Sequence, residues 1–232
     1  MSVVARLRRS GQRVQECRLY LVRHGTTVMS VQNRYRGRRD IPLDAQGYHD
    51  AVDAARRLSG VGLTAVYTGP LRRTIATAQI IADAAGVPDL RILHGLNNLD
   101  YGAWEGMTAE EAASYEPEAH AVYRTSPAEA VCPHGERLID AQRRMIAALQ
   151  LIGSRHPGEA VVAVTHAVMI RLTLVALNGV EGESWRRPIV RGSVTEFRFD
   201  GTIRLAALPE EVGSTLPFVA EARVPAGSPA SV

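Results

Sequence analysis

The chain of 232 residues contains no lysine, because all 27 of its basic residues are arginine. A protein without lysine cannot form a lysine Schiff base, anchor a pyridoxal cofactor, complete a P-loop or build a Ser-Lys dyad. Recognition of phosphate or carboxylate must therefore rely on arginine, histidine and backbone N–H groups.

Cysteine is scarce as well, and Cys17 and Cys132 form neither a CxxC pair nor a disulfide framework. This pattern favours the reducing cytoplasm as the location. Long hydrophobic runs are also missing, since the most apolar stretch, 160–177, is interrupted by His166 and Arg171. We therefore expect that stretch to be a core element rather than a membrane span.

The charge excess is small, at a net +3, and the arginines alternate with Asp and Glu along most of the chain. A nucleic-acid-binding protein usually gathers its positive charge on one stripe, so we expect no nucleic-acid partner. The exception is the arm 1–17, which contains Arg6, Arg8, Arg9 and Arg13. No apolar segment follows these arginines, so we expect the arm to be a solvated terminus rather than a signal peptide or an anion-binding segment.

The hydrophobic pattern predicts one α/β domain over residues 18–208, followed by a flexible tail at 209–232. Short apolar runs alternate with helical periodicity, which indicates βαβ units and a mainly parallel sheet. The expected strands are 18–22, 63–67, 91–93 and 160–164, with a closing hairpin at 194–199 and 203–207. The expected helices are 45–58, 71–85, two short helices within 108–123 that are broken at Pro117, 136–152 and 168–177.

Candidate site residues follow the first predicted strand. Arg23 and His24 stand where that strand ends, and ligands bind outside the carboxyl ends of strands in open α/β sheets. Gly25 would let the backbone approach a ligand closely, and Thr26 and Thr27 would add hydroxyl donors. Taken alone, an Arg-His-Gly triplet is equally consistent with a structural turn.

Two further strand ends strengthen this interpretation. His166 follows the strand 160–164 and precedes a helix, whose first N–H groups are free to bind an anion. Arg72 and Arg73 lie in the first turn of a helix, where the helix dipole disfavours a cation unless an anion is nearby. We expect Arg73 to face that anion and Arg72 to face solvent. Arginine binds phosphate and histidine can accept a phosphoryl group, which points to metal-independent phosphate chemistry.

Six segments carry a resemblance to a known family. They are LVRHGTT at 21–27, RYRGRRDIPLDAQG at 34–47, TGPLRRTIATA at 68–78, LDYGAWEG at 99–106, PHGERL at 133–138 and VTHAVMIR at 164–171. In order and spacing they resemble the histidine phosphatase superfamily, also called the phosphoglycerate mutase-like family. The resemblance implies a three-layer α/β/α fold around a mainly parallel sheet. The sequence has no metal-ligand spacing such as HExxH or paired Asp motifs, so we expect no metal and no cofactor.

The resemblance also implies roles for single residues. His24 would be the nucleophile that becomes phosphohistidine. Arg23, Arg73 and His166 would complete the phosphate pocket, helped by the backbone at Ala167, where the family usually has Gly.

Three positions depart from the family pattern. Thr26 stands where Glu is usual, and Ser30 stands where Asn is usual, so Ser30 would be a shorter phosphate partner. Gly25 and Thr27 keep the family residues and are expected to contact the substrate.

The third departure is the largest, because Asn98 aligns with the family's general acid, a Glu. An amide cannot protonate a leaving oxygen, and general acid–base help is worth about 10²–10⁴-fold.

Three explanations for this departure stay open. Asp100 would replace the acid, since residues two apart in an extended segment face the same way, although a turn or surface carboxylate is the competing interpretation. A substrate with a good leaving group, such as an acyl phosphate or a diphosphate, would need little protonation. The third explanation is loss of catalysis.

The segment WEGMT and the short span 104–135 resemble the phosphatase branch of the family, similar to α-ribazole phosphatase and broad-specificity phosphatases. The resemblance implies a phosphohydrolase that acts on a small phosphorylated metabolite. The alternatives are a phosphoglycerate mutase-type phosphotransferase and a weakened or repurposed phosphate-binding protein. A cap region at about 105–132, with Tyr115, Tyr123 and Arg124, and the adjacent Trp104 would set specificity. The oligomeric state stays open, a homodimer included.

Overall fold

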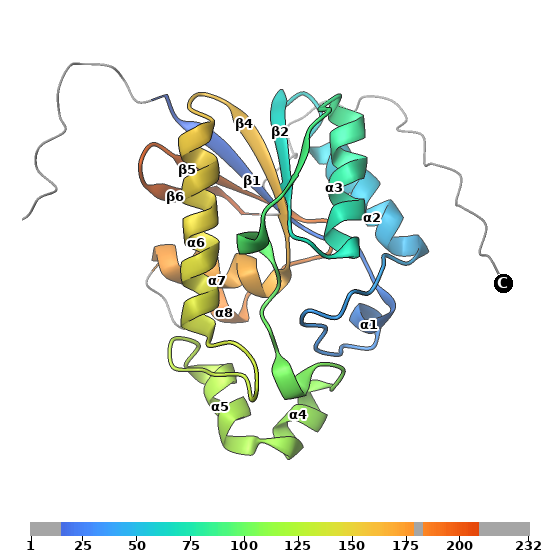
Figure 1. Cartoon of the computed structure of the whole chain (residues 1–232), viewed down its shortest axis with the longest axis vertical. Coiled ribbons are helices and arrows are strands. Elements are labelled where there is room, and N and C mark those ends of the chain that lie inside the picture. The colour runs from blue at the N-terminus through green and yellow to red at the C-terminus, as the bar shows by residue number, and fades with distance from the viewer. Residues whose placement is uncertain (1–14, 179–182, 209–232) are drawn as a thin grey trace, which may run out of the picture.

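The computed structural model describes residues 15–178 and 183–208, and Figure 1 shows their arrangement. Most of the expected basic arm and the whole expected tail at 209–232 lie outside these residues. The first described strand begins at Cys17 and the last ends at Ala207. No helix in the described ranges is long and apolar enough to cross a membrane.

A six-stranded sheet forms the centre, in the order β3-β2-β4-β1-β5-β6. The strands are β1 (Cys17–Arg23), β2 (Leu63–Thr68), β3 (Leu90–Ile92), β4 (Ala160–Thr165), β5 (Val194–Phe199) and β6 (Ile203–Ala207). The first four run parallel, and the β5–β6 hairpin adds two antiparallel strands beside β1. The predicted mainly parallel sheet and its closing hairpin are confirmed.

Helices cover both faces of the sheet (Figure 1). On one face, α2 (Ala45–Arg57) and α3 (Arg72–Ala85) pack over one core cluster, and on the other, α6 (Leu138–Arg155) and α7 (Ala167–Asn178) pack over a second. Alternation along β1 supplies both clusters, because Leu19 and Leu21 face one and Tyr20 and Val22 face the other. The three-layer α/β/α expectation is therefore confirmed.

The cap region lies at one end of the molecule and contains α4 (Ala109–Tyr115) and α5 (Pro117–Thr125). Thr108 and Glu111 form a capping box that starts α4, and Pro117 occupies the first turn of α5. Proline fits there because the first N–H of a helix has no partner inside the helix. The predicted break at Pro117 is confirmed. Short helices α1 (Val28–Val31) and α8 (Glu183–Arg186) and the 3-10 helices His94–Leu96 and Gly102–Trp104 complete the fold.

The register of the parallel strands β1 and β4 determines where the two candidate site histidines lie. In the β1–β4 pair, Arg23 lies opposite Thr165. The backbone N–H of His24 continues the ladder by donating to the Thr165 carbonyl, 3.1 Å away. The next residue after each strand is a histidine, so His24 and His166 emerge side by side at the carboxyl edge of the sheet.

Candidate active site

The two strand-end histidines form a buried pair. His24 is 1% exposed and His166 is 2% exposed. Their ring centroids are 5.1 Å apart, with an angle of 64° between the ring planes. Sequence reasoning expected two histidines at one point, and the structure brings them together.

The surroundings of His24 keep one ring nitrogen available as a nucleophile. Nδ1 lies 2.7 Å from the Gly25 carbonyl, which can only accept a hydrogen bond, so Nδ1 carries the proton and Nε2 keeps its lone pair. Burial first, and then the charges of Arg73 and Arg36, holds the pKa of His24 well below its usual value. The imidazole is therefore neutral at physiological pH, as a nucleophile must be.

The second histidine, His166, differs from His24 in its hydrogen bonding. Neither ring nitrogen has a hydrogen-bond partner among the described residues. Burial, followed by the charge of Arg73, holds its pKa well below the usual value. The residue directly precedes α7, whose first N–H groups point toward the same edge. Buried polar groups normally have partners, so this ring suits a ligand that supplies them.

Two arginines lie beside the histidine pair. Arg73 is fully buried, and its Nη1 and Nη2 donate to the carbonyls of Arg39 (2.7 Å) and Gly37 (2.8 Å). Arg23 donates through Nη1 to the Ile189 carbonyl. The Nε of both arginines is buried and unpartnered. Burial, followed by the charge of Arg36, lowers the pKa of each to about 9.

The neighbouring Arg72 is exposed, as expected, and its backbone N–H donates to Asp40.

A cavity of about 280 Å³ opens beside these groups. Five of the predicted site residues line it: Arg23, Ser30, Asn98, His166 and Ala167. Tyr123, one of the residues expected to set specificity, lines it as well. Trp104 instead packs in the core, and Tyr115 and Arg124 are exposed.

Two of the expected substrate contacts have structural roles in this fold. A Cβ on Gly25 would come within 2.1 Å of the Gly47 carbonyl, so glycine is required by close packing against α2. Thr27 caps α1 by accepting from the backbone N–H of Ser30. The neighbouring Thr26 donates to the Asp50 carboxylate at 2.5 Å. These three residues therefore shape the loop that holds His24.

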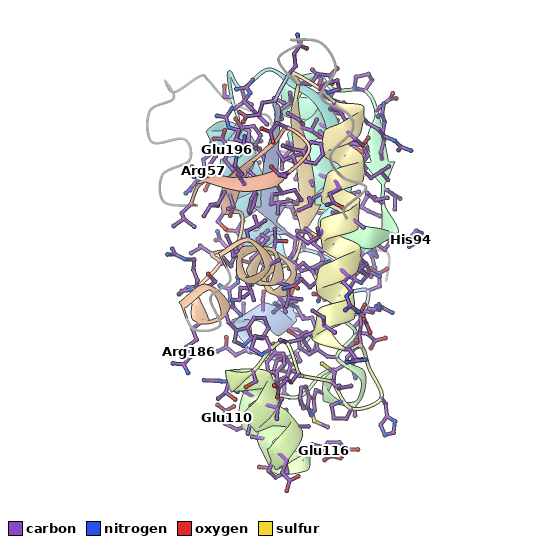
Figure 2. All side chains as sticks on the ribbon, turned by 90° about the vertical axis from the view of Figure 1, so that its left-hand side faces the viewer. Arg57, His94, Glu110, Glu116, Arg186 and Glu196 are labelled. Carbon is purple, nitrogen blue, oxygen red and sulfur yellow. The ribbon has the colours of Figure 1, made fainter. Side chains whose placement is uncertain are left out.

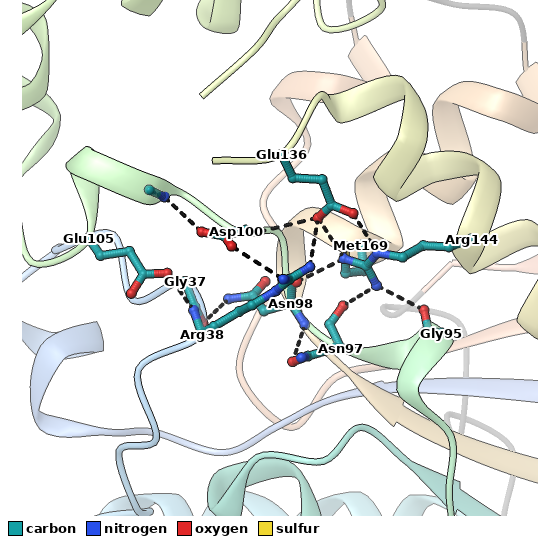
Figure 3. Close-up of polar contacts among 11 residues, drawn as sticks. Gly37, Arg38, Gly95, Asn97, Asn98, Asp100, Glu105, Glu136, Arg144 and Met169 are labelled. Atoms are coloured by element: carbon teal, nitrogen blue, oxygen red, sulfur yellow. Dashed lines mark hydrogen bonds and ion pairs between the residues drawn. The ribbon is translucent and has the colours of Figure 1, made fainter. Parts of the chain in front are cut away.

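The position of the expected general acid is on the cavity wall. Asn98 is 4% exposed, and its Nδ2 donates to the Gly37 carbonyl at 2.9 Å, while Oδ1 is buried without a partner. Arg144 fixes the backbone here by donating to the carbonyls of Asn97 (2.7 Å) and Asn98 (2.8 Å), as Figure 3 shows. Asn98 thus presents a hydrogen-bond acceptor where the family usually has an acid.

Asp100 is not brought to the cavity. One carboxylate oxygen accepts from the Gly102 N–H at 2.9 Å and the other pairs with Arg38 at 3.2 Å (Figure 3). The two-residue alternation of an extended chain does not hold here, because the chain turns at Tyr101 into a 3-10 helix, and the N–H of its first residue, Gly102, donates to Asp100. The idea that Asp100 replaces the acid therefore has no geometric support here.

Eight cavity residues were not among the sequence-predicted site residues, and they include Arg36, Arg171 and Arg191. Arg36 and Arg171 lie inside the segments that carry the family resemblance, and Arg171 is one helical turn after Ala167. The positions of Arg36 and Arg171 in the sequence could therefore have identified them as site residues. Arg191 precedes β5 and reaches the cavity only through the return of the chain from α8, which no local pattern reveals.

The charge distribution of the site is one-sided. No Asp or Glu is among the cavity-lining residues in the described part of the chain. The described part of the chain holds no group of three or more His, Cys, Asp or Glu side chains that could bind a metal ion. Acidic side chains such as Glu110 and Glu116 project instead from the outer end of the cap (Figure 2).

Comparison with known proteins agrees with this geometry. The family model for the histidine phosphatase superfamily (branch 1) matches residues 19–207. The bifunctional protein Rv2228c of Mycobacterium tuberculosis is 34% identical over 196 residues, 83% of this chain but 53% of that protein, so the chain spans about half of that relative. Phosphoserine phosphatase 1 of Hydrogenobacter thermophilus is 33% identical over 167 residues, covering 71% of this chain and 77% of that protein.

A solved structure is similar over most of its length. YhfR from Bacillus stearothermophilus has a TM-score of 0.75 and 34% sequence identity, covering 82% of this chain and 96% of that one. The match of the family model to most of the chain, together with these relatives, makes the protein a member of the histidine phosphatase superfamily.

Proposed function

We propose that the protein is a metal-independent phosphohydrolase that removes phosphate from a small phosphorylated metabolite through a phosphohistidine on His24. The observation that carries the proposal is the buried pair of neutral histidines, with arginines beside it and an adjoining cavity of about 280 Å³. A cavity near the lower limit of ligand pockets, roughly 300 Å³, suits a small substrate. The relative named phosphoserine phosphatase supports a substrate of this kind.

In the first step, Nε2 of His24 attacks phosphorus and an N–P bond forms as the bond to the leaving oxygen breaks. The leaving oxygen keeps the electron pair of that bond and takes a proton from water. Arg23, Arg73 and the first N–H groups of α7 would hold the phosphoryl oxygens, over which charge spreads in the transition state. Fixed donors in a site of low polarity act without reorganisation during the reaction. The hydrogen bond from Nδ1 to the Gly25 carbonyl keeps the ring oriented throughout.

In the second step, water attacks the phosphohistidine and the N–P bond breaks. His24 regains its lone pair, and the proton lost by water remains on the released phosphate or passes to solvent. The unpartnered Oδ1 of Asn98 can accept a hydrogen bond from that water, which would orient the molecule without removing its proton.

A second candidate function is phosphate binding with little turnover. The observation that favours it is Asn98 in the acid position, on a wall without carboxylates in the described residues. A phosphoglycerate mutase-type transfer is the remaining alternative, and it would pass the phosphoryl group to an organic acceptor instead of water.

Trapping the phosphoenzyme tests the proposal. We expect the wild-type protein to release phosphate from p-nitrophenyl phosphate and to form an acid-labile phosphoenzyme. His24→Ala should remove both, because no other ring nitrogen has the same place at the end of β1. The matched control is His94→Ala, which changes an exposed histidine labelled in Figure 2 and should leave both unchanged.

Each alternative predicts a different result in the same assay. A phosphoenzyme without phosphate release, with label appearing in an added phosphoglycerate, would indicate a mutase. Binding of vanadate without any phosphoenzyme would indicate a binding protein. Wild-type turnover in His24→Ala would contradict the assigned nucleophile.

A further inference from the structure

The cavity contains more positive charge than one phosphoryl group neutralises. Five arginines line it: Arg23, Arg34, Arg36, Arg171 and Arg191. Arg34 is paired with Glu111 at 2.7 Å, which leaves four. Arg73 adds a fifth charge beside the histidines. A phosphoryl group carries about two negative charges, so roughly three arginine charges remain without a partner.

Three of these arginines, Arg36, Arg171 and Arg191, line the cavity from the 34–36 segment, α7 and the approach to β5. Arg171 donates through Nε to the Arg187 carbonyl at 2.8 Å, and Arg191 donates through Nη2 to the Ser30 carbonyl at 2.7 Å. These bonds to backbone hold the guanidinium groups in place without neutralising them. The Nε atoms of Arg36 and Arg191 are buried and unpartnered.

Several arginines outside the cavity are neutralised by carboxylates. Arg38, Arg144 and Arg204 each form an ion pair with a carboxylate. In the cavity, burial and then the charges of Arg36 and Arg191 lower the pKa of Arg23 to about 9. The cost of keeping these like charges together would be offset only by an anion that binds among them.

The cavity also lacks a group that can protonate a leaving oxygen well. Asn98 occupies the acid position, and Asp100 is bound to Gly102 and Arg38 outside the cavity. An alkoxide leaving group needs a proton in the transition state, whereas a phosphate leaving group is stable as an anion. Fixed arginines would stabilise such an anion as it forms.

We propose that the substrate is a phosphoric anhydride, in which the transferred phosphoryl group is linked to a second phosphate that Arg36, Arg171 and Arg191 bind. This inference rests on the proposed function and names its substrate class. Nε2 of His24 forms the N–P bond as the P–O–P bridge breaks, and the bridging oxygen leaves with the electron pair as part of the second phosphate. Water then releases the first phosphate, and its proton is shared with the phosphate products.

Substrates that differ in one feature test the proposal on the whole protein, with EDTA present. We expect kcat/KM for inorganic diphosphate and ADP to exceed that for AMP by at least about 10²-fold, the usual scale of general acid help. Acetyl phosphate has a good leaving group without a second phosphate, and we expect it to lie between them. Acetyl phosphate turnover equal to that of diphosphate would overturn the proposal, because activation alone would then suffice.

Variants locate the second phosphate. Arg171→Met and Arg191→Met should lower kcat/KM for diphosphate about tenfold more than for p-nitrophenyl phosphate, since a hydrogen bond to a charged group is lost. Arg204→Met is the control, because Arg204 is paired with Asp200 and Glu16 away from the cavity. Equal losses for both substrates in the Arg171 and Arg191 variants would overturn the assignment.

A binding measurement on the wild-type protein removes any dependence on variant folding. Methylenediphosphonate, which cannot be hydrolysed, should inhibit p-nitrophenyl phosphate turnover at least about tenfold more tightly than inorganic phosphate. Equal inhibition by the two anions would contradict the second phosphate site. If p-nitrophenyl phosphate is hydrolysed while AMP matches diphosphate, the substrate class is wrong and the phosphatase proposal stands. No hydrolysis of any of these compounds would refute the phosphatase proposal itself.

Discussion

Two arginine-rich regions border the 97–100 segment and use positive charge in opposite ways. In the first, Arg144 and Arg38 are paired with Glu136, and Arg144 also binds three backbone carbonyls (Figure 3). In the second, arginines face the cavity, which no carboxylate of the described residues lines. Paired charge holds the backbone in place, and unpaired charge is available to a ligand. The same residue type thus builds a support on one side and a candidate binding surface on the other.

Removing Arg144 from the paired region should give the largest effect, which is a loss of stability. Burial alone would raise the pKa of Glu136, but the hydrogen bonds and charge of Arg144, together with the Asp100 N–H and the charge of Arg38, outweigh it and hold this pKa below its usual range. Arg144→Met removes the shortest hydrogen bonds to that carboxylate, which keeps only the longer ones from Arg38 and the Asp100 N–H, and it takes this donor from three carbonyls. We expect urea denaturation to show a loss of about 3 kcal/mol in the free energy of unfolding. Turnover should fall as well, because Asn98 loses its support.

Arg143→Met is the matched control for this change. Arg143 lies one residue earlier on α6, and its pair with Asp140 is exposed, at 3.3 Å. An exposed pair contributes about 0–1 kcal/mol, so this variant should be close to wild type. Equal stability of the two variants would mean that the Glu136 network does not hold the site.

Adding an acid at the border of the two regions should sharpen the comparison. Asn98→Glu places a carboxyl group on the cavity wall, where it can protonate an alkoxide leaving group. We expect turnover of alkyl phosphates to rise by up to about 10²-fold, with little change for p-nitrophenyl phosphate. The ratio of the two kcat/KM values measures the effect.

Asp100→Asn separates the two positions of the segment. Because Asp100 caps a turn and pairs with Arg38 outside the cavity, the variant should change stability more than turnover. A large loss of alkyl-phosphate turnover, with little gain from Asn98→Glu, would instead assign the acid role to Asp100. If neither variant alters turnover of either substrate type, the acid does not belong to this segment.

A smaller effect is expected when the buried arginine beside the histidine pair is replaced by lysine. Arg73→Lys keeps the charge but loses the planar fork that binds the Arg39 and Gly37 carbonyls and that would bind a phosphoryl oxygen in the proposed mechanism. We expect inhibition by vanadate to weaken about tenfold, measured as Ki against p-nitrophenyl phosphate. Unchanged inhibition would remove Arg73 from the phosphate pocket.

The smallest effect is on stability at mildly acidic pH. The folded protein holds the pKa of His166 below the value of about 6.5 that an unfolded chain has. The unfolded state therefore binds more protons below that pH, so stability is complete above it and falls as the pH decreases. Linkage gives a loss of roughly 0.7 kcal/mol per histidine between pH 7 and 6. Urea denaturation at pH 7 and pH 6 measures this loss. The difference in the free energy of unfolding between the two pH values should be smaller in His166→Ala than in the wild type, and unchanged in His94→Ala.

Periodicity in the sequence was sufficient to predict the layers of this fold. Strand and helix patterns are local, and α6 differs from its predicted range 136–152 by starting at Leu138 and continuing to Arg155. The position of the histidine pair followed from the same patterns, because the ends of parallel strands meet at one edge. Thus the residues brought together by β1 and β4 were predictable from short segments.

The rest of the site depends on where the chain turns. Asp100 faces away from the cavity because the extended conformation ends at Tyr101, which the residues before it do not reveal. Gly25 is needed by the approach of α2 instead of a ligand, and that contact joins distant segments. Arg191 reaches the cavity only because the chain returns beside β1 through β5. Tertiary packing decides all three.

The pairing of β1 has a consequence for how the protein becomes functional. Within the described residues, β1 pairs with β4 and β5 and not with β2, which follows it in the chain. During synthesis, β1 therefore cannot pair with β4 until residues 160–165 have been made. Arg23 and His24, at the end of β1, reach their final positions only after that pairing. The candidate active site is assembled late and over a long sequence separation, which makes loop closure costly. Recovery of phosphate binding during refolding should accordingly report completion of the whole sheet rather than formation of its early helices.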